Sequence, residues 1–133
     1  MQPSRRLRYS GIWYVLGAGL MAAVVVASLV PDPLDTDIKE GDKIAHLLAY
    51  GSLMFWFGML GATSRARLAW AVALAALGVG LEYAQQMTGY RSFDVLDMVA
   101  NTAGVGLGWL IAVTPAGRLL RWLDGGLARG RAH

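Results

Sequence analysis

Four long stretches of this chain are almost free of charge, and they limit what it can fold into more than any other feature. Each stretch holds at most one Asp, Glu, Lys, Arg or His. An α-helix of about 20 mostly apolar residues crosses the hydrocarbon core of a bilayer. The sequence therefore predicts four transmembrane helices, at residues 12–30, 44–62, 68–87 and 95–114.

The composition favours a membrane protein over a soluble one. Of the 133 residues, 56% are hydrophobic and only 16% are charged. A soluble domain of this size has too little interior to bury that much apolar surface, whereas a protein in lipid can expose it. Because the connections are short, consecutive helices should run antiparallel. We therefore expect one all-α domain over residues 1–133, an integral membrane bundle of four antiparallel transmembrane helices.

The basic residues predict the orientation. Nine of the twelve Lys and Arg residues lie before the first stretch, between the second and third, or after the fourth. Positive loops stay in the cytoplasm, so both termini are expected there. The net charge of +3 therefore reports topology, and without aromatic residues interleaved in a basic patch it predicts no nucleic-acid partner. Cys is absent, which excludes disulfides and thiolate metal sites.

Both ends of the chain have further features. The basic start, the apolar run and the small residues around Ala27 also fit a cleavable signal peptide, although the length of the run favours a retained helix. After the fourth stretch, leucines and Trp122 alternate with Arg118 and Arg121. This pattern predicts a short amphipathic tail on the membrane surface.

Most of the remaining polar residues gather where the second, third and fourth stretches approach the extracytoplasmic face. Asp42, His46 and Tyr50 have the i, i+4, i+8 spacing of one helix face. Pairs on the next two helices reach the same depth on the same side. The candidate site residues are Asp42, Lys43, His46, Tyr50, Glu82, Gln85, Arg91, Asp97 and Asn101.

Glu82 makes this cluster informative. It lies roughly 7 to 8 Å inside the outer end of its expected helix, at the α-helical rise. A charge deep in the bilayer costs on the order of 2.5 to 3.5 kcal/mol, so Glu82 needs a partner, a proton or water. His46 and Glu82 are the candidate acid–base pair, and the other seven residues are candidate ligand-binding groups.

Simpler interpretations remain open. Asp42 and Asp94 fit helix N-caps. Gly104 and Gly108 form a GxxxG pair, which predicts close helix packing either within the chain or in a homo-oligomer. The whole polar cluster could also be an ion-pair network that only fixes helix packing.

The motifs resemble the VanZ-like membrane protein family. That family's pattern has D-K-x-x-H-x-x-x-Y on one helix, E-x-x-Q at the end of the next, and then R, D and N before spaced glycines. The segments that match are DKIAHLLAYGSL from Asp42 and EYAQQMTGYRSFDVLDMVANTAGVGLG from Glu82. The resemblance implies a multi-pass protein of the bacterial cytoplasmic membrane. The founding member is associated with resistance to the glycopeptide teicoplanin, but the family name supplies no mechanism.

Three functions follow as hypotheses. In the first, the site recognises a cell-envelope component, and Lys43 and Arg91 clamp its anionic lipid or cell-wall precursor head group. The second is an enzyme that acts on a lipid or envelope precursor, with His46 and Glu82 as acid and base. The third is a structural or assembly protein.

A metal variant of the enzyme would use His46, Glu82 and Asp97, but no H-x-x-x-H spacing supports it, so no metal and no cofactor are predicted. The expected partners are the lipid bilayer, the head group and a second copy of the chain. A transporter is disfavoured because none of the four expected helices is broken near the bilayer midplane, and so small a bundle has no second repeat that could move against the first.

Overall fold

The chain forms helices throughout the part that the structure describes. The computed structural model describes residues 6–31, 39–61 and 63–131. Five α-helices and one short 3-10 helix lie in these ranges, with no strand among them, so the all-α prediction is confirmed. The elements are α1 (Ser10–Leu29), α2 (Lys39–Leu60), α3 (Ser64–Met87), α4 (Val95–Ala112), η1 (Pro115–Arg118) and α5 (Leu119–Gly130).

Two helices begin four or five residues earlier than the apolar stretches suggest. α3 begins four residues sooner because Thr63 caps it, accepting a hydrogen bond from the Ala66 amide. α2 already begins at Lys39, so Asp42 lies within the helix and the N-cap interpretation of Asp42 is wrong. Polar first turns extend beyond the apolar run that marks a span, so hydropathy alone cannot place these starts.

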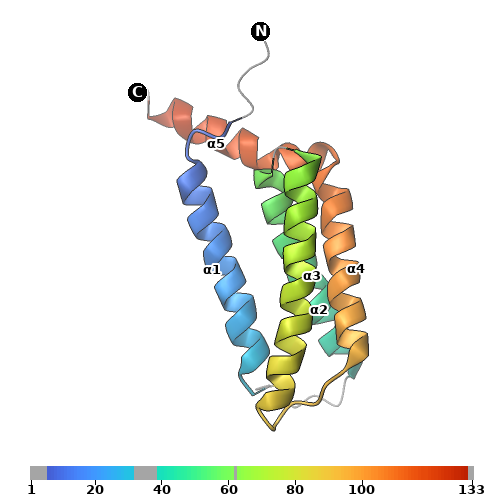
Figure 1. Cartoon of the computed structure of the whole chain (residues 1–133). Coiled ribbons are helices and arrows are strands. Elements are labelled where there is room, and N and C mark those ends of the chain that lie inside the picture. Colours follow the sequence, from blue (N-terminus) through green and yellow to red (C-terminus); the bar gives the residue numbers. More distant parts are fainter. Residues whose placement is uncertain (1–5, 32–38, 62, 132–133) are drawn as a thin grey trace.

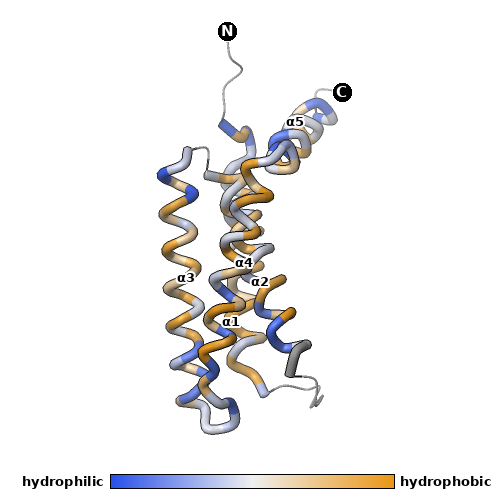
Figure 2. The backbone as a smooth tube through the Cα atoms, turned by 90° about the vertical axis from the view of Figure 1, so that its right-hand side faces the viewer, coloured by the Kyte–Doolittle hydropathy of each residue, from blue (hydrophilic) through white to orange (hydrophobic). Residues whose placement is uncertain are grey.

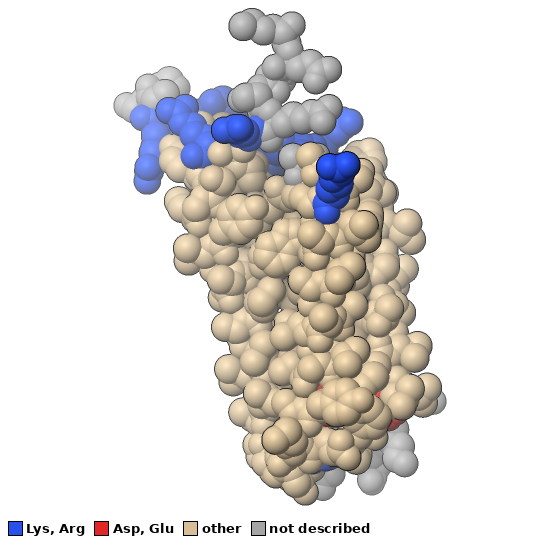
Figure 3. Space-filling view, viewed as in Figure 1, with Lys and Arg blue, Asp and Glu red and all other residues tan. Residues whose placement is uncertain are grey.

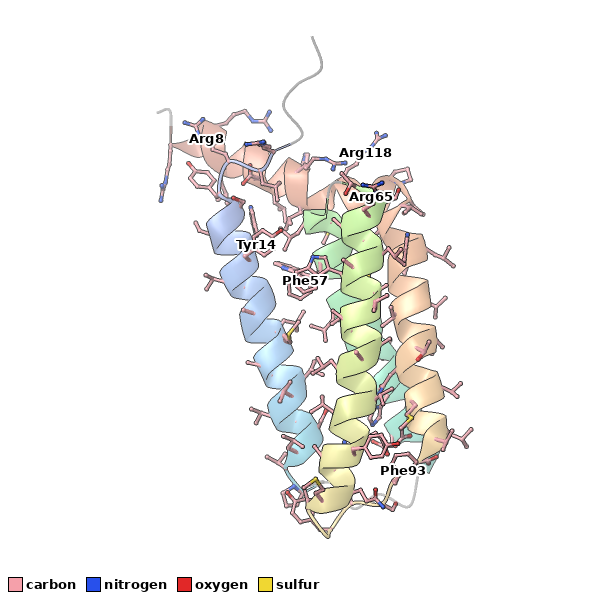
Figure 4. The ribbon with its side chains drawn as sticks, in the orientation of Figure 1. Arg8, Tyr14, Phe57, Arg65, Phe93 and Arg118 are labelled. Atoms are coloured by element: carbon pink, nitrogen blue, oxygen red, sulfur yellow. The ribbon has the colours of Figure 1, made fainter. Side chains whose placement is uncertain are left out.

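The four long helices stand side by side, and α5 lies across one end of them (Figure 1). Arg8, Arg65 and Arg118 lie at this end, and Phe93 lies at the opposite end (Figure 4). In the space-filling view the basic side chains gather at the end that α5 crosses, and most of the flank that faces the viewer shows no charged side chain (Figure 3). The molecule therefore has a basic end and, opposite to it, the end that carries Phe93.

The flanks of the bundle are apolar on the outside. Large hydrophobic side chains such as Val15, Val72 and Leu110 are more than half exposed, and hydrophobic residues recur along every long helix (Figure 2). Four helices are long and apolar enough to cross a membrane: Ser10–Leu29, Gly41–Leu60, Ser64–Met87 and Val95–Ala112. Such an exterior is stable in lipid and would aggregate in water.

α2 forms the centre of the bundle. Its side chains Tyr50, Leu53, Met54 and Phe57 are almost completely buried, and the Phe57 ring stacks on Trp70 of α3 with 4.0 Å between ring centroids. Phe57, an aromatic residue in the middle of α2, therefore belongs to the core.

Glycines allow α4 to approach the backbone of α2. A Cβ added at Gly104 would lie 3.0 Å from the Gly51 amide nitrogen and would clash with the Leu47 carbonyl oxygen. A Cβ at Gly108 would clash with the Gly51 carbonyl oxygen. This face is therefore filled by α2 of the same chain, and we do not retain the alternative of a homo-oligomer through Gly104 and Gly108.

We expect Gly104→Ala and Gly108→Ala each to destabilise the protein by about 1–3 kcal/mol, because the added methyl forces two backbones apart. Gly106→Ala is the matched control, since its Cβ would meet no atom within 4 Å. Thermal unfolding in detergent micelles measures the difference. Equal melting temperatures for all three variants would contradict the close α2–α4 contact.

α5 holds the start of α1 through one carboxylate. Asp124 is 6% exposed and accepts hydrogen bonds from the backbone amides of Arg8 and Tyr9, at 2.7 and 2.9 Å, and from Trp13 Nε1 at 2.8 Å. The first amides of a helix lack partners within the helix and carry partial positive charge. Tyr9 is the N-cap residue of α1 and Arg8 precedes it, so Asp124 caps the entry to α1 from a distant segment. The amphipathic tail predicted from the sequence is present, but this contact was not predicted.

Asp124→Ala should lower the free energy of unfolding by about 1–2 kcal/mol, the usual loss when a helix cap is removed. Thermal unfolding in micelles measures it, with Arg121→Ala, an exposed change on the same helix, as control. A wild-type melting temperature for Asp124→Ala would contradict the capping role.

The same contact predicts a pH dependence. Burial opposes ionisation of Asp124, but the hydrogen bonds from Trp13 and the two amides outweigh it, so its pKa lies below the ordinary value. A depressed folded-state pKa gives stability that is complete above the unfolded pKa, about 3.9, and is lost as the pH falls through the folded value. The advantage of wild type over Asp124→Asn should therefore hold at pH 7 and shrink below about pH 4.

Candidate functional site

The polar residues predicted as a site gather at the end of the bundle that carries Phe93. The first turns of α2 and α4, the last turns of α3 and the α3–α4 loop contribute them, and hydrogen bonds, ion pairs and two shared cavities connect them. The structure brings together all nine predicted residues: Asp42, Lys43, His46, Tyr50, Glu82, Gln85, Arg91, Asp97 and Asn101.

Lys43 joins α2 to the start of α4. Its Nζ lies 2.9 Å from Asp94 Oδ2 and 3.3 Å from Asp97 Oδ1. Asp94 also caps α4, accepting a hydrogen bond from the Leu96 amide at 2.8 Å, which confirms the cap prediction. The hydrogen bond from Lys43 is the main cause that lowers the pKa of Asp94, followed by the one from Leu96. The pairing of Asp94 with Lys43 was missed, because the cap interpretation already accounted for Asp94.

His46 lies between α2 and α4. Its Nδ1 is 2.9 Å from Asn101 Oδ1, so the side-chain amide oxygen of Asn101 on α4 has its hydrogen-bond partner on α2. Its Nε2 faces two carboxylates, 3.7 Å from Asp42 Oδ1 and 3.8 Å from Asp97 Oδ2.

Glu82 is turned inward and not toward lipid. It is 1% exposed, and its Oε1 accepts a hydrogen bond from the Asp94 amide at 2.6 Å. Its Oε2 and the buried Tyr50 hydroxyl have no hydrogen-bond partner among the described residues. Within the same part of the chain no hydrogen bond joins Glu82 to His46, so the two candidate acid–base groups are neighbours without direct contact.

Three side chains donate hydrogen bonds to the backbone carbonyl oxygens at the end of α1. Gln85 Nε2 and Arg91 NH1 each donate to the Ser28 carbonyl oxygen at 2.8 Å, and the Tyr90 hydroxyl donates to the Leu29 carbonyl oxygen. The last four carbonyls of a helix lack partners within it, and lipid offers none. These carbonyls were not part of the predicted site, although the rule about helix ends, applied to the donors on the α3–α4 loop, could have found them.

Two cavities meet at Asp42 and Arg91. The first, of about 280 Å³, lies between α1 and α2 and has Ala27 and Ala49 in its wall and His46 at its polar end. The second, of about 340 Å³, is lined mainly by polar residues of α2, the α3–α4 loop and α4. A molecule with an apolar and a polar part could therefore contact both.

Comparison with known families identifies the chain. A family model described as VanZ/LLP1 matches residues 8–120, which include the four long helices and all nine candidate site residues. The chain belongs to the VanZ/LLP1 family. No curated protein and no solved structure matches it. Together with its four membrane-length apolar helices, this match makes the chain a VanZ-like membrane protein.

The site of this VanZ-like protein has more carboxyl groups than Lys and Arg side chains. Among the described side chains it has four carboxylates, of Asp42, Glu82, Asp94 and Asp97, against the two cations Lys43 and Arg91. Its close group of potential metal ligands also differs from the set considered from the sequence. Asp42, not Glu82, joins His46 and Asp97, because Glu82 is turned to the Asp94 amide.

Lys43→Met should lower the melting temperature and the membrane abundance of this VanZ-like protein. It leaves the carboxylate of Asp97, 6% exposed, without its nearest cation. Adding Asp97→Asn should restore part of the loss, because it removes the uncompensated charge. Arg65→Met, at the basic end, is the control. Additive losses in the double variant would show that the two residues do not interact.

Proposed function

We propose that this VanZ-like membrane protein binds the anionic head group of a cell-envelope lipid or lipid-linked precursor at the outer face of the bacterial cytoplasmic membrane. The observation that carries the proposal is the pair of cavities that share Asp42 and Arg91. One has a wall of small apolar side chains and the other a polar lining, which suits an amphiphile.

The positive-inside rule supports the orientation. Arg8, Arg65 and Arg118 lie at the end where α5 crosses the bundle (Figure 4). Basic residues concentrate on the cytoplasmic side of membrane proteins. We therefore assign both termini to the cytoplasm and the polar site to the extracytoplasmic face, with consecutive helices antiparallel in one domain.

The contacts support different roles for the two cations, Lys43 and Arg91. Lys43 is already engaged by Asp94 and Asp97, so we give it a positioning role. Arg91 lines both cavities, and its NH2 is 3.9 Å from Asp42, longer than a hydrogen bond. Among the described residues its NH2 has no hydrogen-bond partner, and a guanidinium is well suited to phosphate or carboxylate, so Arg91 contacts the head group in our proposal. His46 and Tyr50, in the first cavity, orient it.

The other two hypotheses make different demands on the same residues. Acid–base catalysis would need Glu82 free to exchange protons with a substrate, whereas its Oε1 is held by the Asp94 amide and its Oε2 is buried. A purely structural role would explain the ion pairs of Lys43 but not the cavities beside Arg91. Glycopeptide resistance would follow only if the bound component contributes to the drug's target, so susceptibility to teicoplanin is a secondary measurement.

Arg91→Gln and Ala27→Leu should each weaken binding of a phosphomonoester lipid by about tenfold or more, the first by removing a charged donor and the second by filling the apolar cavity. Phosphatidic acid in nanodiscs is the probe, phosphatidylcholine is the comparison lipid, and native mass spectrometry measures occupancy. Ala73→Leu, on an exposed position of α3, is the control for Ala27→Leu.

Membrane abundance and melting temperature are measured for every variant, because Arg91 also donates to the Ser28 carbonyl oxygen. Lost binding in a stable variant supports the head-group site. Unchanged lipid occupancy in both variants, or equal binding of the two lipids by wild type, would sink the proposal.

A further inference from the structure

Asp42, His46 and Asp97 bring three potential metal-ligating atoms to one place. These atoms all lie within 4.8 Å of one another. Two ligands come from α2 with i, i+4 spacing, and the third comes from the first turn of α4. We propose that the triad binds a divalent first-row transition metal ion such as Zn²⁺. This inference goes beyond the proposed head-group function and does not depend on it.

The hydrogen bond of His46 prepares it as a ligand. When Nδ1 donates to Asn101 Oδ1, 2.9 Å away, the lone pair of the neutral ring is on Nε2. That nitrogen faces Asp42 Oδ1 and Asp97 Oδ2, two further electron-pair donors. Three lone pairs that converge repel one another unless a proton or a metal cation lies between them. Metal-binding histidines commonly have such an oriented second nitrogen.

The distances suit a small cation. Bonds of about 2.0–2.2 Å in a tetrahedral Zn²⁺ site place ligand atoms about 3.3–3.5 Å apart. The separations from Nε2 are 3.7 and 3.8 Å, and all three ligand atoms lie within 4.8 Å of one another, so side-chain rotations that bring the two carboxylate oxygens closer would complete the geometry. Asp97 has a free oxygen for this purpose, because Lys43 binds Oδ1 while Oδ2 faces His46.

Two observations outside the triad also indicate a cation. The described side chains of the site have two more carboxyl groups than Lys and Arg residues, so a divalent ion would offset negative charge there. Tyr50 lines the same cavity as Asp42 and His46, and its buried hydroxyl has no partner among the described residues. A metal-bound water that reached this hydroxyl would supply one.

Three protein ligands leave a coordination position open. The cavity of about 280 Å³ beside Asp42 and His46 gives that position access to a water or an anionic ligand. The His and carboxylate donors suit Zn²⁺ and Mn²⁺ better than the softer ions that thiolates select.

Metal binding to the chelator-stripped protein in detergent, without lipid, tests the proposal. The protein prepared for this experiment has no polyhistidine tag and carries the substitution His133→Asn, so His46 is its only histidine. Competition with a fluorescent chelator should give one Zn²⁺ per chain. Asp42→Asn, His46→Gln and Asp97→Asn should each lower the affinity at least tenfold. Asp124→Asn, which alters an equally buried carboxylate outside the triad, should leave it unchanged.

X-ray absorption of the zinc-loaded protein provides a readout that does not need a stable variant. One nitrogen and two or more oxygens at about 2.0–2.2 Å are expected. Absence of stoichiometric binding to a folded protein, or coordination by oxygen alone, would overturn the metal site. The head-group proposal would stand or fall separately, on lipid binding by Arg91 variants.

Discussion

Lipid provides no hydrogen-bonding partners, and this constraint explains where polar residues lie in the molecule. A helix has free amides at its start and free carbonyls at its end, and both must find partners within a membrane protein. Asp124 meets the need at the start of α1, and Gln85, Tyr90 and Arg91 meet it at the end. The hydrogen bonds that tie α1 to the rest of the chain thus lie near its two ends, while Leu20, Met21 and Val24 pack against the core.

The framework and most of the site could be predicted from hydropathy and spacing. Runs without charge located the helices, and i, i+4 spacing placed Asp42 and His46 on one face. Hydropathy could not place the start of α2, because its first turn is polar. The partner of Asp124 was also beyond reach, since a lone carboxylate in a basic tail gives no indication of which distant amides it meets.

The fine geometry of the site depends on backbone contacts that the sequence indicates only in part. The GxxxG pair predicts close packing but does not name the partner. In the structure the partner is α2, and the absence of a side chain at Gly104 lets α4 approach Gly51. This proximity brings His46 within 2.9 Å of Asn101 and Lys43 within 3.3 Å of Asp97. A larger residue at the glycine would therefore change both contacts, although it lies outside the polar cluster.

Charge balance then decides what the assembled site can attract. Lys43 compensates Asp94 and Asp97 and so contributes little free positive potential to the cavities. Removing it would add repulsion between carboxylates and would not merely remove an anion contact. Arg91 differs because its guanidinium lines both cavities and, among the described residues, hydrogen-bonds to a backbone oxygen and lies 3.9 Å from Asp42. An anionic ligand at this site is therefore favoured beside Arg91 and repelled near the α4 carboxylates, unless a cation shields them.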